Sequence, residues 1–148
     1  MGINVRNFYF LIAGILAILF AFTHAWNGQS AVLPMLHVSA IAMDTRTVFM
    51  YVWHIITAEN LVFGIVFMFM SFQSDYMKIR FAAWTIVSLL IVRLLVILGI
   101  TALQDVSALA DTFIDSIAII IYVTFIIIGI RRKPKEFGDQ TPHSGRAE

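Results

Sequence analysis

Four long apolar blocks constrain this chain more than any other feature. They cover about residues 8–26, 47–72, 81–103 and 109–130. A helix needs about 20 mostly apolar residues to cross the hydrocarbon core of a bilayer. Lipid offers backbone N–H and C=O groups no partner, and the blocks lack the alternation of a membrane β-barrel. The sequence therefore predicts an all-α membrane protein, an antiparallel bundle of four transmembrane helices within residues 1–133.

Composition supports this class and excludes several others. Of the 148 residues, 60% are hydrophobic and 13% are charged, whereas about 25% are charged in a typical soluble domain. The absence of cysteine excludes disulfides, thiolate metal sites and iron–sulfur clusters. A net charge of +1 indicates no affinity for nucleic acid. The sequence contains no recognisable pair of a nucleophile and a general base, which favours a non-catalytic role. The expected partners are the lipid bilayer and either a second copy of the chain or another membrane protein.

Lysine and arginine predict the orientation. Arg6 precedes the first span, Lys78 and Arg80 lie between the second and third, and four basic residues follow the fourth in the range 131–135. The loop after the first span has Arg46 alone, and the loop after the third has none. Because cytoplasmic loops are enriched in basic residues, both termini are expected in the cytoplasm. The expected location is a bacterial inner membrane.

The connections differ in length. Residues 73–80 and 104–108 are short, which predicts antiparallel neighbours on either side of each. The first connection is longer, and Asn27-Gly28 is a turn signal at its start. Residues 31–43 are mostly apolar and predict a short helix at the outer interface.

The two ends of the chain carry separate expectations. The tail, residues 134–148, is rich in Pro, Gly and charge and is expected to be disordered. The first block has a cleaved signal peptide as a less favoured alternative, because Arg6 is a weak charged region and the apolar stretch is long for a signal.

Three polar residues fall near the middle of predicted spans. A rise of about 1.5 Å per residue places Glu59 and Asn60 at mid-depth of the second span and Arg93 at mid-depth of the third. Since these spans are antiparallel neighbours, Glu59 and Arg93 are expected at similar depth, where they could pair. An ion pair would lock the register of the two helices. The alternative is a site that binds a polar group or relays a proton.

Four further ionisable residues, His24, His54, Asp111 and Asp115, fall in the outer half. Two imidazoles with carboxylates suit a divalent transition metal such as zinc, copper or iron, and two histidines alone suit a haem iron bound from both faces. Structural alternatives exist. His24 can be an interfacial residue, His54 can bond a neighbouring helix, and Asp111 can cap the fourth helix.

Helix angles bear on how these groups combine. At about 100° per residue, His54 and Glu59 are about 140° apart around the second span. They are therefore expected to face different neighbours, and the sequence indicates two polar layers rather than one merged site.

Glycines within the spans are expected to mark close approaches between helices. They are Gly14, Gly64 and Gly99.

Two segments carry a resemblance to a known group of proteins. They are residues 24–28, HAWNG, followed by 32–36, VLPML, and residues 51–54, YVWH. These resemble a group of small, uncharacterised bacterial membrane proteins with four helices, in which a histidine ends the first helix and a Trp-His pair opens the second. The resemblance covers the first half of the chain. It implies an inner-membrane protein with His24 and His54 as marked positions, and it brings no known reaction.

Three functional hypotheses follow from the sequence. The favoured one is a non-catalytic membrane subunit or scaffold in which polar pairs fix helix packing. The second is a protein that binds a metal or haem through His24 and His54, with Asp115 and Asp111 as further ligands. The third is a small transporter or proton-relay component that uses the layer of Glu59, Asn60 and Arg93.

Overall fold

The computed structural model describes residues 5–38 and 41–132, and this part of the chain is helical almost throughout. The elements are α1 (Phe8–Asn27), a π-helical turn (Gly28–Val32), α2 (Leu33–Val38), α3 (Met43–Phe72), α4 (Tyr76–Gln104), a 3-10 helix (Val106–Ala110) and α5 (Phe113–Arg131). Four helices are long and apolar enough to span a membrane: Phe8–Leu36, Met43–Phe72, Tyr76–Gln104 and Phe113–Arg131. The predicted four-helix architecture is confirmed.

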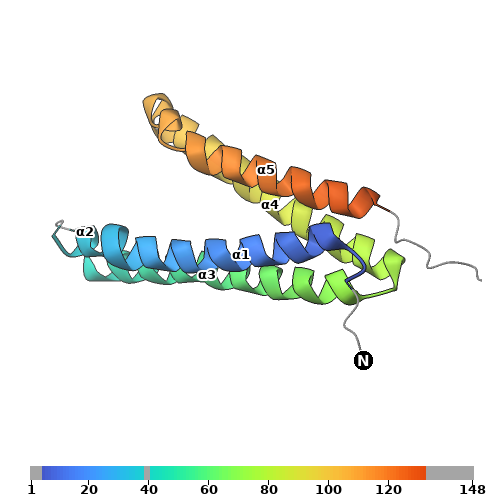
Figure 1. The fold of residues 1–148 in the computed structure, drawn as a ribbon. Coiled ribbons are helices and arrows are strands. Elements are labelled where there is room, and N and C mark those ends of the chain that lie inside the picture. The colour runs from blue at the N-terminus through green and yellow to red at the C-terminus, as the bar shows by residue number, and fades with distance from the viewer. Residues whose placement is uncertain (1–4, 39–40, 133–148) are drawn as a thin grey trace, which may run out of the picture.

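The helices form two antiparallel hairpins. α1 packs along the length of α3, and α4 packs along α5 (Figure 1). The two hairpins lie together at the end that carries the short connection between α3 and α4, and they part toward the opposite end (Figure 1). α3 and α4 are antiparallel, as the short connection predicted, but they share few contacts along their length.

The hydrophobic core fills one half of the bundle. Its fully buried side chains include Phe10, Phe67, Val87 and Ile126, one from each spanning helix. We call this end the packed half; it comprises residues 8–17, 63–72, 76–90 and 122–131. The other end, comprising residues 18–27, 43–62, 91–104 and 113–121, is called the open half.

Polar contacts close the end of the packed half. Asn7 caps α1, because its Oδ1 accepts hydrogen bonds from the backbone N–H groups of Tyr9 and Phe10. Its Nδ2 donates to the Gly129 carbonyl oxygen of α5 at 2.9 Å. Asp75 caps α4 and pairs with Lys78 at 2.9 Å, and the hydrogen bond from that ammonium lowers the pKa of the Asp75 carboxyl.

Two glycines let α1 and α3 touch through their backbones. A Cβ on Gly64 would lie 2.5 Å from Cγ1 of Ile18 and 2.9 Å from the Gly14 carbonyl oxygen. A Cβ on Gly14 would lie 2.9 Å from the Gly64 carbonyl oxygen. The predicted close approach is confirmed at these two positions. It is wrong at Gly99, where no described atom lies within 4 Å of an added Cβ.

The first connection differs from the sequence prediction. Gly28 is helical, with φ −56° and ψ −53°, so Asn27-Gly28 is not a turn. The chain instead continues from α1 through the π-helical turn into α2, which lies within the predicted interfacial segment. Position 28 requires glycine because the indole of Trp53 occupies the volume that a Cβ would need. The predicted disordered tail, 134–148, lies outside the described residues.

Candidate functional site

The core-facing stripe of each spanning helix reaches a polar residue in the open half. Residues three or four positions apart share one face of a helix, so each stripe can be followed along the sequence. The stripes run through Phe10, Ala17 and Ala21 to His24 on α1, through Phe67 and Phe63 to Asn60 on α3, through Ile86 and Leu90 to Arg93 on α4, and through Ile126 and Val123 to Ser116 on α5. We call His24, Glu59, Asn60, Arg93 and Ser116 the border site.

Arg93 is the centre of the border site. Its Nη1 donates a hydrogen bond to Oδ1 of Asn60 at 3.1 Å, and its Nη2 pairs with the Glu59 carboxylate. The Arg93 side chain is 19% exposed and that of Glu59 is 36% exposed. The ion pair between Glu59 and Arg93, whose similar depth was expected from the sequence, is therefore present. It joins the two hairpins through α3 and α4.

His24 lies on α1 against Trp53 of α3. The two rings stack with centroids 4.3 Å apart and planes 7° apart. Trp53 Nε1 donates to the His24 carbonyl oxygen at 3.0 Å, which fixes the indole. The His24 Nε2 atom is buried and has no hydrogen-bond partner among the described residues.

α5 contributes one buried polar side chain, that of Ser116. Its side chain is 9% exposed, and its buried Oγ finds no hydrogen-bond partner within residues 5–38 and 41–132. Asp115, the preceding residue, is exposed. Asp111 is also exposed and does not cap α5, because the N-cap residue is Thr112 and it makes no side-chain cap bond. The polar groups of α5 thus divide into one buried hydroxyl and two exposed carboxylates.

His54 faces away from the border site. Its Nε2 lies 3.2 Å from Nε2 of Gln29 in the π-helical turn. It also lines a shallow groove of about 580 Å³ on α3, together with Thr47, Met50, Tyr51, Ile55 and Ala58. His54 and Glu59 therefore face different neighbours, as the helix angles predicted.

The proposed metal ligands do not form a cluster in the part of the chain that the structure describes. Among the described residues, no group of three or more His, Asp or Glu side chains could hold a metal ion. The imidazoles of His24 and His54 are engaged with different neighbours, Trp53 and Gln29. The set of His24, His54, Asp111 and Asp115 is therefore not assembled as a metal site in this conformation.

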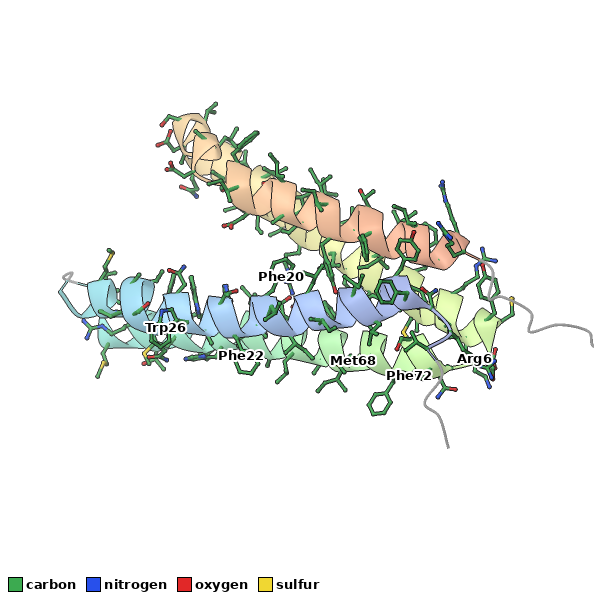
Figure 2. All side chains as sticks on the ribbon, in the orientation of Figure 1. Arg6, Phe20, Phe22, Trp26, Met68 and Phe72 are labelled. Carbon is green, nitrogen blue, oxygen red and sulfur yellow. The ribbon has the colours of Figure 1, made fainter. Side chains whose placement is uncertain are left out.

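An apolar groove lies between α1 and α5. It has a volume of about 180 Å³ and is lined by Leu16, Phe20, Ala118, Ile121, Tyr122 and Phe125. Figure 2 shows Phe20 where the two hairpins begin to part. Its ring meets that of Tyr122 edge to face, with centroids 5.7 Å apart. The Tyr122 hydroxyl donates to the Ala13 carbonyl oxygen, so the groove presents no free hydroxyl there. We call this the α1–α5 groove.

Sequence reasoning missed Ser116. A serine near a helix start is commonplace, and its residue type alone gave no signal. The available signal was its position, because Ser116 continues the spacing of Val123, Ile126 and Ile130 on the buried face of α5.

Comparison of the chain with protein-family models, with curated proteins and with solved structures gives no match. The resemblance carried by residues 24–28, 32–36 and 51–54 therefore stays a prediction, and the function has to be argued from the geometry.

Proposed function

We propose that this protein is a non-catalytic membrane subunit that binds a small molecule through a polar group at the border site. The observation that carries the proposal is that the core-facing stripe of every spanning helix reaches a polar residue beyond the packed half, within one turn on α3 and α4 and about two turns further along on α1 and α5. Ligand sites of helix bundles are built in this way, from side chains on facing helices.

The buried atoms of the site support binding over a purely structural role. An ion pair between Glu59 and Arg93 is enough to lock the register of α3 and α4. It does not account for the buried Nε2 of His24 or the buried Oγ of Ser116, both without a described partner. An unsatisfied buried polar group costs about 1–3 kcal/mol, and more where water is scarce. A ligand that hydrogen-bonds these atoms would remove that cost.

The packed half supports binding over transport across the membrane. In the packed half, Phe10, Phe67, Val87 and Ile126 belong to one buried core cluster. A proton or solute path needs polar groups or water along its length. The site is therefore reached from the open half.

Filling the site with a bulky side chain should expel the ligand. We expect Ser116→Phe to abolish retention of the bound molecule, because the new ring enters the interior between the helices. Ile114→Phe is the matched control, since Ile114 lies on the same turn but is 79% exposed. The protein would be purified in mild detergent and extracted with organic solvent, and the extract analysed by mass spectrometry.

The expected result is a molecule present at about one per chain in the wild type and in Ile114→Phe, and absent from Ser116→Phe. Circular dichroism and gel filtration must show that all three proteins are folded. A folded wild-type protein with no more extracted material than Ser116→Phe contradicts the proposal. His54→Ala should retain the molecule, because His54 faces away from the site. Loss in that variant would favour a metal or haem held by both histidines.

We further propose that the packed end faces the cytoplasm, in the inner membrane of a bacterium. Arg6, Lys78, Arg80, Arg131 and Arg132 lie at that end of the bundle. The opposite end carries mainly carboxylates, among them Asp105 and Asp111. An excess of basic residues marks the cytoplasmic side of membrane proteins.

The chain lacks cysteine, so single introduced thiols report this orientation cleanly. We expect an impermeant maleimide to label Val106→Cys in intact cells, since Val106 lies at the open end and is exposed. Ser74→Cys, in the connection between α3 and α4, should be labelled only after the cells are permeabilised. The reverse pattern would place both termini on the outside.

A further inference from the structure

The α1–α5 groove leads along α5 to an arginine at the packed end of the bundle. At about 100° per residue, Arg132 lies within about 40° of Ala118, Ile121 and Phe125 around α5, so it continues the face that lines the groove. We propose that this face binds an anionic phospholipid, with the phosphate at Arg132 and one acyl chain in the α1–α5 groove.

A chain of contacts joins Arg132 to the groove. Its guanidinium carbon lies 5.2 Å from the centroid of the Tyr9 ring of α1. The Tyr9 ring in turn lies 5.2 Å from that of Phe125, which lines the groove. Gly129 lets Tyr9 come this close to α5, because a Cβ there would lie 3.0 Å from the Tyr9 Cβ. The phosphate position and the groove therefore belong to one continuous surface of α1 and α5.

The charge of Arg132 is available to a phosphate. The side chain is exposed, and it has no carboxylate partner in the part of the chain that the structure describes. Contact with an aromatic ring orients a guanidinium without neutralising it. Its N–H groups can then bind a phosphate through two parallel hydrogen bonds. Arg131 adds a second positive charge at the same helix end, so an anionic headgroup is favoured over a zwitterionic one, which brings its own cation.

The depth of the groove matches an acyl chain below that phosphate. Phe125 and Ala118 precede Arg132 by seven and fourteen residues, so they lie about 10 and 20 Å deeper along the helix. Half of the hydrocarbon core measures about 15 Å. The groove, with a volume of about 180 Å³, suits several methylene groups. It is open to the bilayer, since Phe20 and Ile121 on its two walls are 37% and 63% exposed.

Lipid titrations of the full chain, followed by native mass spectrometry, test the headgroup. Dioleoyl phosphatidylglycerol and dioleoyl phosphatidylcholine carry the same tails and differ in headgroup charge. We expect the wild type to bind phosphatidylglycerol about tenfold more tightly, and Arg132→Gln to lose this preference. Arg80→Gln is the matched control. Arg80 lies over the Tyr76 ring at 5.3 Å, but on α4, which contributes no residue to the groove. It should keep the preference.

Filling the groove tests the position of the tail. Ala118→Trp should weaken phosphatidylglycerol binding about tenfold, which corresponds to about two buried methylene groups. Ile121→Trp, at a more exposed position of the same groove, should act in the same way. Ala58→Trp, on an exposed position of α3, is the matched control and should bind as the wild type does. Circular dichroism checks that each variant is folded. Free glycerol phosphate, which has no tail, should not displace the lipid.

Other results would overturn the inference in identifiable ways. Equal losses in Arg132→Gln and Arg80→Gln would show a response to overall basic charge, and equal binding of the two lipids by the wild type would refute headgroup selection. Unchanged binding in the folded tryptophan variants would refute the tail position. Displacement by glycerol phosphate would indicate a site for soluble phosphates. Ser116 lies on the opposite face of α5, about 180° from Phe125, so these outcomes are independent of the test of the border site.

Discussion

Arg93→Met is expected to lower the free energy of unfolding by about 3 kcal/mol, because it leaves the Glu59 carboxylate without its cation at membrane depth. Removing one partner of a buried ion pair costs about 3–5 kcal/mol, and the lower end applies here because Glu59 is 36% exposed. Asn60 would also lose the hydrogen bond from Arg93. The measurement is reversible unfolding in mixed micelles, followed by tryptophan fluorescence.

The double variant Glu59→Gln/Arg93→Met is the control for this prediction. It removes both charges while keeping two side chains of similar volume, and replacing a whole buried pair is often close to neutral. We expect it to recover most of the lost stability. If Arg93→Met alone stays within about 1 kcal/mol of the wild type, the pair does not join the hairpins in the membrane. The double variant also separates two roles of the pair. A register lock alone predicts a stable protein that retains its bound molecule, whereas a binding role predicts a stable protein that loses it.

The depth of Glu59 and Arg93 could be predicted because it depends on local geometry. Helical rise is fixed, and the short connection around Ser74 sets the two helices antiparallel with little freedom of register. The same reasoning gave four spans, because length and apolar content alone decide which segments can cross a bilayer. It misplaced the start of the fourth helix, which begins at Phe113 after a 3-10 helix, rather than at residue 109.

The remaining features depend on contacts between distant segments. The stacking of His24 on Trp53 requires α1 and α3 to lie side by side, and nothing local to either segment states that. Asn27-Gly28 carries the composition of a turn, yet Gly28 is a helical residue beneath Trp53. Tertiary packing overrode the local signal at that position. The burial of Ser116 depends in the same way on helices that are distant in the sequence.

The close contact between α1 and α3 yields the second large prediction. Gly64→Leu is expected to destabilise the protein by about 3 kcal/mol, at the upper end for overpacking. The new Cβ would meet the Gly14 carbonyl oxygen at 2.9 Å and the Ile18 backbone nitrogen at 3.0 Å. These are backbone atoms, so no side-chain rotation can relieve the overlap, and the two helices have to separate. Unfolding in mixed micelles measures the loss.

Gly99→Leu is the matched control, because it makes the same substitution in α4 where no described atom lies within 4 Å. Its effect should stay within about 1 kcal/mol, the difference in helix propensity between the two residues. Separation of α1 from α3 would also unstack His24 from Trp53, so Gly64→Leu should change the tryptophan emission while Gly99→Leu should not. Equal stability losses in the two variants would mean that leucine disturbs these helices wherever it replaces glycine. A loss confined to Gly64→Leu would locate the hairpin contact, and with it the frame that holds His24 at the border site, at the crossing of Gly14 and Gly64.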